Sequence, residues 1–336
     1  MSNNNPADRL THLMQKLDGA YAPNTLRAYQ ADMQEFIRFC EERPIEALPA
    51  QPETVATFLL GTLDQGIKSS TVKRKVSSIS AVHRLLSLPD PTKHPEVRIT
   101  QRKIYRQLGT RFDQAYPVTR TLLEKMLTVC ASDLHGLRNR ALLLTAYESM
   151  RRRSELVALR IEDIEWGADN SAAILLRRSK TDQAGQGKWI QLSARAGQAI
   201  EAWLRATNLE SGYVFRGVRA NGTVTEFLCD SRISRIYKSL AKNADLPDSI
   251  VRRLSGHSMR VGAAQDQLIS GASLPQIMVK GGWSKVDTVM RYVERVYASV
   301  RHPMPPYHLQ KGDPEYLDIE PEALSLQVLG IQGHLF

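Results

Sequence analysis

Residues 255–283 read SGHSMRVGAAQDQLISGASLPQIMVKGGW, and their spacing decides how this part of the chain folds. His257, Arg260 and Leu268 fall on one helical face, so the stretch predicts a helix that begins near the histidine. That helix places an imidazole beside a guanidinium near a helix N-terminus, where the dipole favours an anion. The alternative is a buried histidine with a satisfied hydrogen bond.

A run of arginines lies upstream, in MRRRSELVALR at residues 150–160. On a helix Arg152 shares an apolar stripe with Glu155, whereas Arg151 and Arg153 diverge from it by about 100° each. Glu155 can hold the inward guanidinium while its remaining donors face an anion such as phosphate. An ordinary ion pair on a helix surface is the alternative.

Two tyrosines follow downstream, in and just after VDTVMRYVERV at residues 286–296. Tyr292 and Tyr297 both lie on apolar stripes, so helical spacing does not choose between them. Core packing is the alternative for each tyrosine. Trp283 precedes this segment.

The remaining periodicity predicts a mainly α-helical chain. AAILLRR (172–178) and KWIQLS (188–193) predict two short strands around a turn rich in Gly and Gln. Asn24 is the predicted cap of a helix, and Ser69 or Ser70 of another. Helical spacing covers residues 25–42, 52–66, 69–88, 97–108, 121–131, 137–149, 194–207, 230–244 and 274–281. We expect a flexible tail over 1–17, a helical domain over 18–112, a helical domain with a hairpin over 113–300, and a tail over 301–336.

Composition excludes several classes of protein. The chain has 336 residues, 42% hydrophobic and 24% charged, with a net charge of +10. At about 150 residues per domain it can form two cores, which excludes a disordered chain, a collagen and a disulfide scaffold. No apolar run approaches the roughly 20 residues that span a bilayer, and we expect no leader. Cys40, Cys130 and Cys229 lie far apart, so we expect reduced thiols in a cytoplasm, and neither a metal nor another cofactor.

Together these segments resemble the tyrosine recombinases of the phage integrase family, and most closely the Cre-type enzymes. The resemblance covers Tyr21 to about Val296. Its strongest stretches are AYESMRRRSELVALRIEDI (146–164), RRSKTDQAG (177–185), the stretch 255–283 and VMRYVER (289–295). The resemblance implies a mainly α-helical, two-domain, C-shaped DNA clamp that performs site-specific recombination through a Holliday junction.

The resemblance also implies a role for each matching residue. Tyr292 would attack a DNA phosphodiester and form a 3′-phosphotyrosyl bond, which conserves the bond energy so that rejoining needs no ATP. Arg152 and Arg260 would stabilise the transition-state charge in place of metal ions. The supporting roles are orientation of Arg152 by Glu155, proton handling by His257, a phosphate hydrogen bond from Trp283, and protonation of the departing 5′-hydroxyl by Lys180. Lys188 is the rival of Lys180, and Tyr297 is the rival of Tyr292. The family usually has apolar or small residues where Arg151 and Arg153 stand.

DNA recognition is expected from the first domain and from charge. Lys73, Arg74 and Lys75 begin a predicted helix that the resemblance places against DNA, although a solvated helix end is the alternative. A second basic strip, suited to a DNA backbone, is formed by Arg98, Arg102, Lys103 and Arg106.

Partners follow from the same resemblance. We expect a homotetramer on two inverted-repeat sites in double-stranded DNA, no membrane partner, and a nucleoid-associated enzyme encoded by a bacterium or a phage. PEALSLQVLGI (321–331) is a candidate helix for docking on a neighbouring protomer, or for folding back on its own domain. The rival functions are a type IB topoisomerase-like nicking and closing activity and a DNA-binding protein that does not cut.

Overall fold

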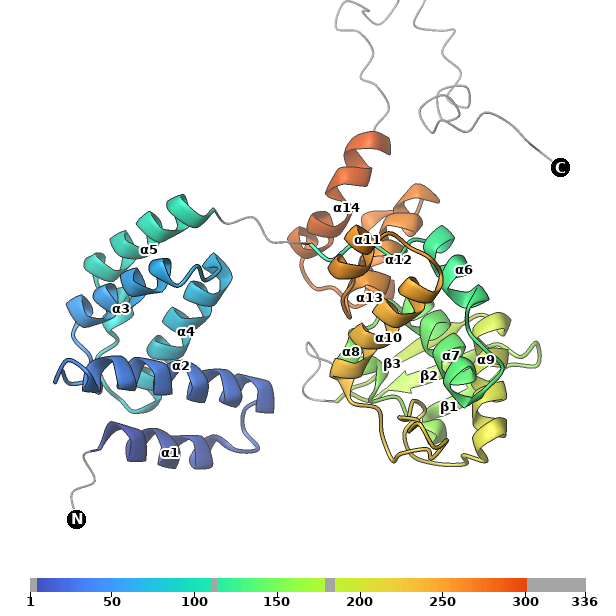
Figure 1. Ribbon diagram of the computed structural model, residues 1–336, viewed down its shortest axis with the longest axis horizontal. Helices are drawn as coiled ribbons and strands as arrows, with labels where there is room; N and C mark the ends of the chain where they lie inside the picture. Colours follow the sequence, from blue (N-terminus) through green and yellow to red (C-terminus); the bar gives the residue numbers. More distant parts are fainter. Residues whose placement is uncertain (1–4, 110–113, 179–184, 301–336) are drawn as a thin grey trace, which may run out of the picture. The chain divides into compact units, whose positions relative to one another are not determined.

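The computed structural model describes residues 5–109, 114–178 and 185–300, and the remaining residues lie outside this account. The chain divides into two compact units, Met1–Asp113 and Gln114–Phe336 (Figure 1). Each unit has its own apolar core, as their lengths allow. None of the described helices is both long and apolar enough to cross a bilayer.

The first unit is a bundle of helices. Its elements are α1 (Pro6–Leu17), α2 (Pro23–Glu41), α3 (Pro52–Asp64), α4 (Ser69–Leu85), the short 3₁₀ helix η1 (Pro91–Lys93) and α5 (Pro95–Leu108). Helix α2 packs on α4, and α3 packs on α5. Phe36, Leu59, Ile79 and Ile104 lie at the centre of the resulting core. Regularly spaced apolar residues therefore build this unit, as the sequence predicts.

The expectation of a flexible tail over residues 1–17 is wrong. Helix α1 begins after Asn5, whose side chain caps it, and its Leu10, Leu13 and Leu17 are buried in the core. Two predicted caps also differ, since α2 begins at Pro23, ahead of Asn24, and α4 follows Lys68. A proline in the first turn and an extended preceding residue are sufficient to start α2 without a capping side chain.

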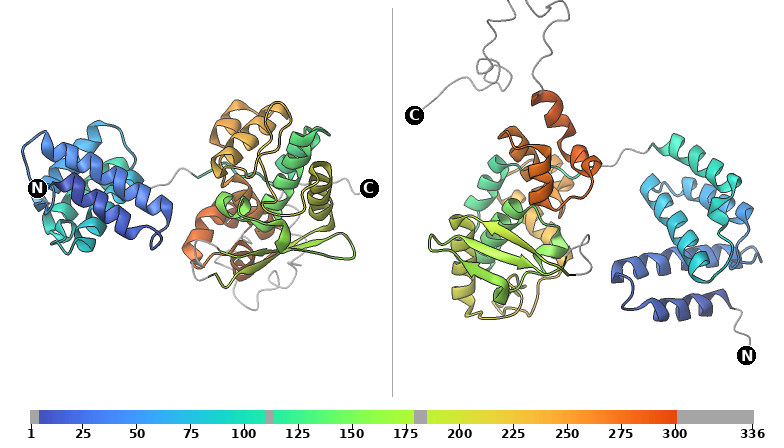
Figure 2. Two further views of the ribbon diagram at one scale, coloured as in Figure 1. Left: turned by 90° about the horizontal axis from the view of Figure 1, so that it is seen from below. Right: turned by 180° about the vertical axis from the view of Figure 1, so that it is seen from behind.

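The second unit packs helices against one face of a small sheet. Its first part contains α6 (Arg120–Thr128), α7 (Leu134–Ser149), α8 (Arg153–Leu156), the 3₁₀ helix η2 (Ile161–Asp163), β1 (Ile164–Trp166), β2 (Ala172–Leu176), β3 (Lys188–Leu192) and α9 (Ala194–Thr207). Among the described residues the strands pair antiparallel in the order β1-β2-β3, with Ile174 opposite both Ile164 and Ile190. One face of the sheet packs on α7 and α9 (Figure 2). The sequence predicts the β2–β3 pair but not β1, which has only three residues.

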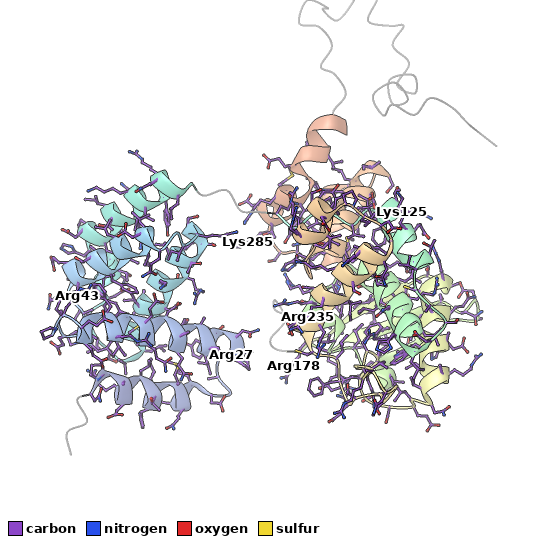
Figure 3. The ribbon with its side chains drawn as sticks, viewed as in Figure 1. Arg27, Arg43, Lys125, Arg178, Arg235 and Lys285 are labelled. Atoms are coloured by element: carbon purple, nitrogen blue, oxygen red, sulfur yellow. The ribbon has the colours of Figure 1, made fainter. Side chains whose placement is uncertain are left out.

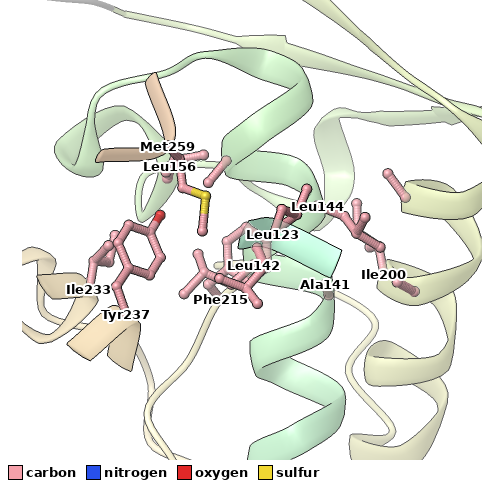
Figure 4. Close-up of a cluster of buried hydrophobic side chains, with 14 of the residues drawn as sticks. Leu123, Ala141, Leu142, Leu144, Leu156, Ile200, Phe215, Ile233, Tyr237 and Met259 are labelled. Atoms are coloured by element: carbon pink, nitrogen blue, oxygen red, sulfur yellow. The ribbon is translucent and has the colours of Figure 1, made fainter. Parts of the chain in front are cut away.

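The last part of the chain is helical and carries the candidate site. It comprises α10 (Asp230–Asn243), α11 (Asp248–Arg253), α12 (Ser258–Ile269), α13 (Leu274–Gly281) and α14 (Val286–Val300). The main core of this unit gathers around Leu142, Phe215 and Tyr237 (Figure 4). A separate apolar cluster, built from α12, α13 and α14 around Ile277 and Val293, holds the C-terminal helices together.

Candidate active site

Two arginines follow the end of α7 and point in different directions. Met150 adopts the left-handed conformation (φ 50°, ψ 30°), so Arg151 and Arg152 lie between α7 and α8 rather than on a helix. Arg152 donates from Nη1 to Glu155 Oε1 at 2.8 Å and from its backbone N–H to Oε2 at 3.1 Å. The expectation that Arg152 is the inward residue is wrong, because Arg151 is 4% exposed and the Arg152 side chain is 22% exposed. Helical spacing does not apply here, since α7 ends before both residues.

Glu155 is buried and stays ionised through Arg152. Burial by itself raises the pKa of a carboxyl group, but the hydrogen bonds from the side chain and backbone N–H of Arg152 outweigh it and lower the pKa of Glu155. Arg153, the third residue of the run, pairs instead with Asp230 of α10 at 3.1 Å and is exposed. Only one of the three arginines is therefore oriented by Glu155.

Arg260, on the first turn of α12, is the most deeply placed cation of the site. It is 1% exposed, and its guanidinium carbon lies 3.8 Å from the ring centroid of Trp283. Its Nη1 donates to the carbonyls of Met150 and, at 2.8 Å, Gly281, whereas its Nη2 has no hydrogen-bond partner among the described residues. Burial and the nearby Arg152 lower the pKa of Arg260 to about 9. A buried donor without a partner is costly, and an anion would satisfy it.

His257 precedes Arg260 by three residues, at the N-terminus of the same helix. It is the residue that precedes α12, it is exposed, and its backbone N–H donates to Ser255 Oγ at 3.2 Å. The alternative of a buried core histidine is therefore wrong. The exposed His257 and the buried Arg260, whose Nη2 has no partner among the described residues, thus lie at the same helix N-terminus, which itself favours negative charge.

Trp283 joins Arg260 to the helix that carries Tyr292. The indole is 6% exposed, and its ring centroid lies 5.8 Å from that of Tyr292 at an interplanar angle of 51°. The backbone carbonyl of Tyr292 accepts hydrogen bonds from the amides of Gln265, at 2.8 Å, and Gln114, at 3.2 Å. Helix α14 is thus fixed at the turn that carries this tyrosine.

The contacts of the two tyrosines of α14 differ. Tyr292 is close enough to Arg260 for its phenolate charge to raise the pKa of that guanidinium, and it contacts Trp283. Both tyrosines are half-buried and pack against the apolar cluster of α12, α13 and α14, so the difference lies in the contacts of Tyr292 with Arg260 and Trp283. The geometry therefore favours Tyr292 as the tyrosine of the cationic site.

Comparison with known proteins identifies the class of this site. The Phage integrase family profile matches residues 118–298, and that of the phage integrase N-terminal SAM-like domain matches residues 12–88. The chain is a tyrosine recombinase of the phage integrase family. Enzymes of this class exchange DNA strands, and the recombination predicted from the sequence motifs is confirmed at this level.

Known relatives cover most of this recombinase. It is 28% identical over 293 residues to the recombinase cre of Escherichia phage P1, with 82% of this chain and 85% of the relative covered. It is 29% identical over 291 residues to the integrase/recombinase xerD homolog of Selenomonas ruminantium, with 83% and 84% covered.

Solved structures show the same fold at lower identity. XerH recombinase bound to a palindromic difH substrate, in a post-cleavage complex, gives a TM-score of 0.63 at 16% identity over 87% of this chain and 83% of that one. A lambda integrase dimer bound to a COC′ core site gives 0.57 at 16% identity over 85% and 76%. The mainly helical fold class is thereby confirmed.

Of the two hairpin lysines of the recombinase, the structure describes Lys188. Lys180 lies outside the described residues. Lys188, at the start of β3, donates from Nζ to the carbonyl of Val279 at the end of α13. Burial and the charge of Arg151 lower the pKa of Lys188. The ammonium of Lys188, at the base of the hairpin, is thus hydrogen-bonded to α13, the helix that precedes Trp283.

The basic residues of α4 that were expected to contact DNA differ in exposure. On α4, Lys73 and Arg74 are exposed, with Arg74 paired to Asp32 at 2.6 Å, but Lys75 is 3% exposed and pairs with Glu35. The expectation that Lys75 faces DNA is contradicted by this burial, because its ammonium lies inside the bundle, 5.1 Å from the ring centroid of Phe58.

Exposed cations occur on both units. On α5 all four predicted residues are exposed, namely Arg98, Arg102, Lys103 and Arg106. Figure 3 shows two cations of the second unit that the sequence analysis did not select, Arg178 after β2 and Arg235 of α10, extending from its surface. Arg178 lies in the stretch 177–185 that carries the family resemblance but was given no role there, whereas Arg235 lies in none of those stretches.

Other residues of the site were missed for a similar reason. Gln114 falls outside every motif, and Gln265 lies within the stretch 255–283 but is uncharged, so no sequence signal pointed to their bonds with the Tyr292 carbonyl. Arg151 was visible as a departure from the family pattern, but its burial depends on the end of α7 and could not be read from spacing.

Proposed function

We propose that this recombinase cleaves and rejoins DNA at specific sites with Tyr292 as its nucleophile. The phenol oxygen of Tyr292 attacks the phosphorus of a phosphodiester, so a Tyr–O–P bond forms and the bond from phosphorus to the 5′ oxygen breaks. The tyrosine proton passes to His257, and the departing 5′ oxygen takes a proton from Lys180. Attack by a 5′-hydroxyl on the phosphotyrosine reverses these steps and rejoins the strand.

One observation carries this proposal. Arg260 is buried, stacked on Trp283 next to Tyr292, and has an Nη2 donor with no partner among the described residues. A non-bridging phosphate oxygen fits that donor, and the positive charge of the guanidinium would stabilise the extra charge of the transition state. Arg152, fixed by Glu155, would supply donors to the same phosphate, and Trp283 would add its indole N–H.

Recognition of the duplex would come mainly from the first unit. Lys73 and Arg74 at the start of α4, with the exposed basic face of α5, are suited to phosphate contacts. The two units, residues 18–112 with α1 added and residues 113–300, would close around DNA as a C-shaped clamp. The lambda integrase and XerH structures similar to this chain are bound to DNA sites, which supports a duplex partner.

Assembly and location are further parts of the proposal. Two inverted-repeat sites would each hold two copies, giving a homotetramer in which strands are exchanged in pairs through a Holliday junction. Residues 321–331, outside the described part of the chain, would dock on a neighbouring protomer. The enzyme would act on bacterial or phage DNA in the cytoplasm, associated with the nucleoid.

A nicked suicide substrate, carrying inverted repeats taken from beside the gene, tests the function. The nick lets the cleaved end diffuse away, so we expect a covalent protein–DNA adduct that survives SDS and maps to Tyr292 after proteolysis. Tyr292→Phe should bind DNA with unchanged affinity and form no adduct, whereas Tyr297→Phe should keep the wild-type rate. An adduct on Tyr297 would overturn the nucleophile assignment.

The same substrate distinguishes the rival functions. Relaxation of a supercoiled plasmid that lacks the sites would favour a topoisomerase-like activity. Specific protection of the repeats with no adduct would favour a protein that binds DNA without cutting it. Deletion of residues 318–336 should leave binding to one site intact and weaken assembly of two sites in a gel-shift titration.

A further inference from the structure

Three consecutive backbone carbonyls at the C-terminus of α13 each accept a hydrogen bond from a different cation. The C-terminal carbonyls of a helix carry partial negative charge and lack partners within the helix. The three cations come from three separate elements: β3, the segment between α7 and α8, and α12. The donor and acceptor pairs are Lys188 with Val279, Arg151 with Lys280, and Arg260 with Gly281. We call these three cations the α13 cap.

The carbonyls that the α13 cap binds lie just before Trp283 in the chain. Gly282 follows α13 in the left-handed conformation (φ 66°, ψ 45°) and turns the chain so that the indole faces Arg260. The packing leaves no space at this turn. A Cβ atom on Gly281 would meet the ring of Trp283 at 1.9 Å, and one on Gly282 would meet Nη1 of Arg151 at 2.7 Å. The position of Trp283 is therefore set by the cations that hold the last turn of α13.

The side chain of Arg151 links the end of α7 to the end of α13 by hydrogen bonds. Its Nε donates to the carbonyl of Ser149 at 3.0 Å, while Nη2 donates to the carbonyl of Lys280. Both of these acceptors are neutral backbone carbonyls, and burial lowers the pKa of the guanidinium. Without this side chain, the link between the ends of α7 and α13 would rest on Arg260 Nη1, which donates to the carbonyls of Met150 and Gly281.

Lys188 links the β2–β3 hairpin to the same end of α13. It begins β3, and its bond to Val279 is a side-chain link from that strand to α13. Arg151 is near enough to lower the pKa of Lys188 by repulsion, in addition to the effect of burial. The partial negative charge at the C-terminus of α13 thus holds together cations that would otherwise repel one another.

We propose that Arg151 and Lys188 are positioning residues of the recombinase, which together with Arg260 hold the C-terminus of α13 and thereby keep Trp283 against Tyr292. This inference rests on the proposed function for its effect on cleavage, but the placement of Trp283 can be tested separately. Removal of either residue should loosen Trp283 without removing a group that touches DNA.

The test compares Arg151→Met and Lys188→Met with two control variants of similar change, Arg153→Met and Lys125→Met. Arg153 pairs with Asp230 and Lys125 is exposed on α6, so neither contacts α13 in any bond described above. Acrylamide quenching of Trp283 is obtained as the difference between each variant and the same variant with Trp283→Phe. Single-turnover adduct formation at saturating DNA and the Kd for DNA are measured in parallel.

We expect the quenching constant of Trp283 to rise at least about twofold in both cap variants and in neither control, because the indole leaves its buried position. Adduct formation should slow about 30-fold for Arg151→Met and about 10-fold for Lys188→Met, since a small misplacement of reacting groups is enough for such losses. The Kd for DNA should stay within about threefold. Lys188→Arg, which keeps a donor, should restore most of the rate.

Unchanged quenching in Lys188→Met, or equal slowing in the controls, would overturn the proposal. So would a change in quenching without a change in rate. If Arg151→Met does not fold, Lys188→Met and its rescue still decide the question. If the wild-type protein forms no adduct, the proposed function fails, while the quenching comparison still shows whether the α13 cap holds Trp283.

Discussion

The two units both bury basic side chains, but they give them different partners. In the first unit Lys75 is buried against Glu35, so a carboxylate cancels its charge. In the second unit the buried Arg151 and Arg260 donate to backbone carbonyls, which satisfy hydrogen bonds but leave the charge in place. A cation paired with a carboxylate is neutralised inside the bundle, whereas a cation on carbonyls remains able to attract an anion.

Arg138 of α7 extends this contrast within the second unit. It is buried, and its Nε and Nη2 donate to the amide oxygen of Asn139 at 3.0 and 2.7 Å. Burial and the nearby Arg232 lower its pKa to about 10. A buried arginine that donates to a neutral acceptor is therefore found outside the candidate active site as well.

The largest expected effect comes from removing the most buried of these cations. Arg260→Met should reduce the single-turnover rate of adduct formation about 10²- to 10³-fold, because it removes a donor aimed at developing charge. Arg205→Met is the matched control, since Arg205 is exposed on α9 and pairs with Glu201 at 2.5 Å. A rate for Arg260→Met within threefold of that control would contradict the contrast between buried cations on carbonyls and cations paired with carboxylates.

Glu155→Gln should have the next largest effect, an approximately 10-fold slower cleavage, because Arg152 loses the carboxylate that orients it. The folded state lowers the pKa of Glu155, so its ionic contribution to stability is present above the pKa of the unfolded chain and is lost as pH falls through the folded pKa. The difference in free energy of unfolding between wild type and variant should therefore be constant near neutral pH and shrink in acid. Urea titrations at several pH values measure it, and a difference that grows in acid would contradict this assignment.

Exposed cations should act on binding and not on chemistry. Arg102→Gln on α5 should reduce the slope of log Kd against log salt by about 1, since one phosphate contact releases about one counterion. Fluorescence anisotropy with the repeat DNA measures the slope. Cleavage at saturating DNA should keep its rate, and an unchanged slope would remove Arg102 from the DNA-binding face.

The smallest effect is expected for the paired cation of the first unit. Lys75→Met should change the free energy of unfolding by less than about 1 kcal/mol, because methionine fits a buried site and Glu35, whose side chain is 42% exposed, stays solvated. Urea unfolding measures this value. A loss of cleavage activity at saturating DNA in this variant would show that the first unit's buried charge serves the reaction after all.

Local signals were enough for much of the fold. The helix over residues 194–207 was predicted to the residue, because Ser193 caps it and Asn208 ends it in the left-handed conformation. Residues 6–17 were misjudged although Asn5 and the spacing of three leucines carried the same kind of signal. Lys75 was misjudged as well, since it lies on the apolar stripe of Val72 and Ile79.

The candidate site was predictable in composition but not in geometry. Arg260, Trp283 and Tyr292 could be selected because motifs mark them. The relative burial of Arg151 and Arg152 depends on Met150 ending α7, which is decided by packing between segments far apart in sequence. The bonds to α13 likewise join residues about 90 to 130 positions apart, and no local pattern encodes them.

Gln114 is the first residue of the second unit, and its side chain holds the carbonyl of Tyr292. The polypeptide that leaves the first unit is therefore anchored, at its first described residue in the second, on the turn that carries the phenol. The Gln265 amide of α12 donates to the same carbonyl, so the chain that enters the second unit and α12 share one acceptor on α14. A displacement of either segment would therefore reach the turn of Tyr292 directly.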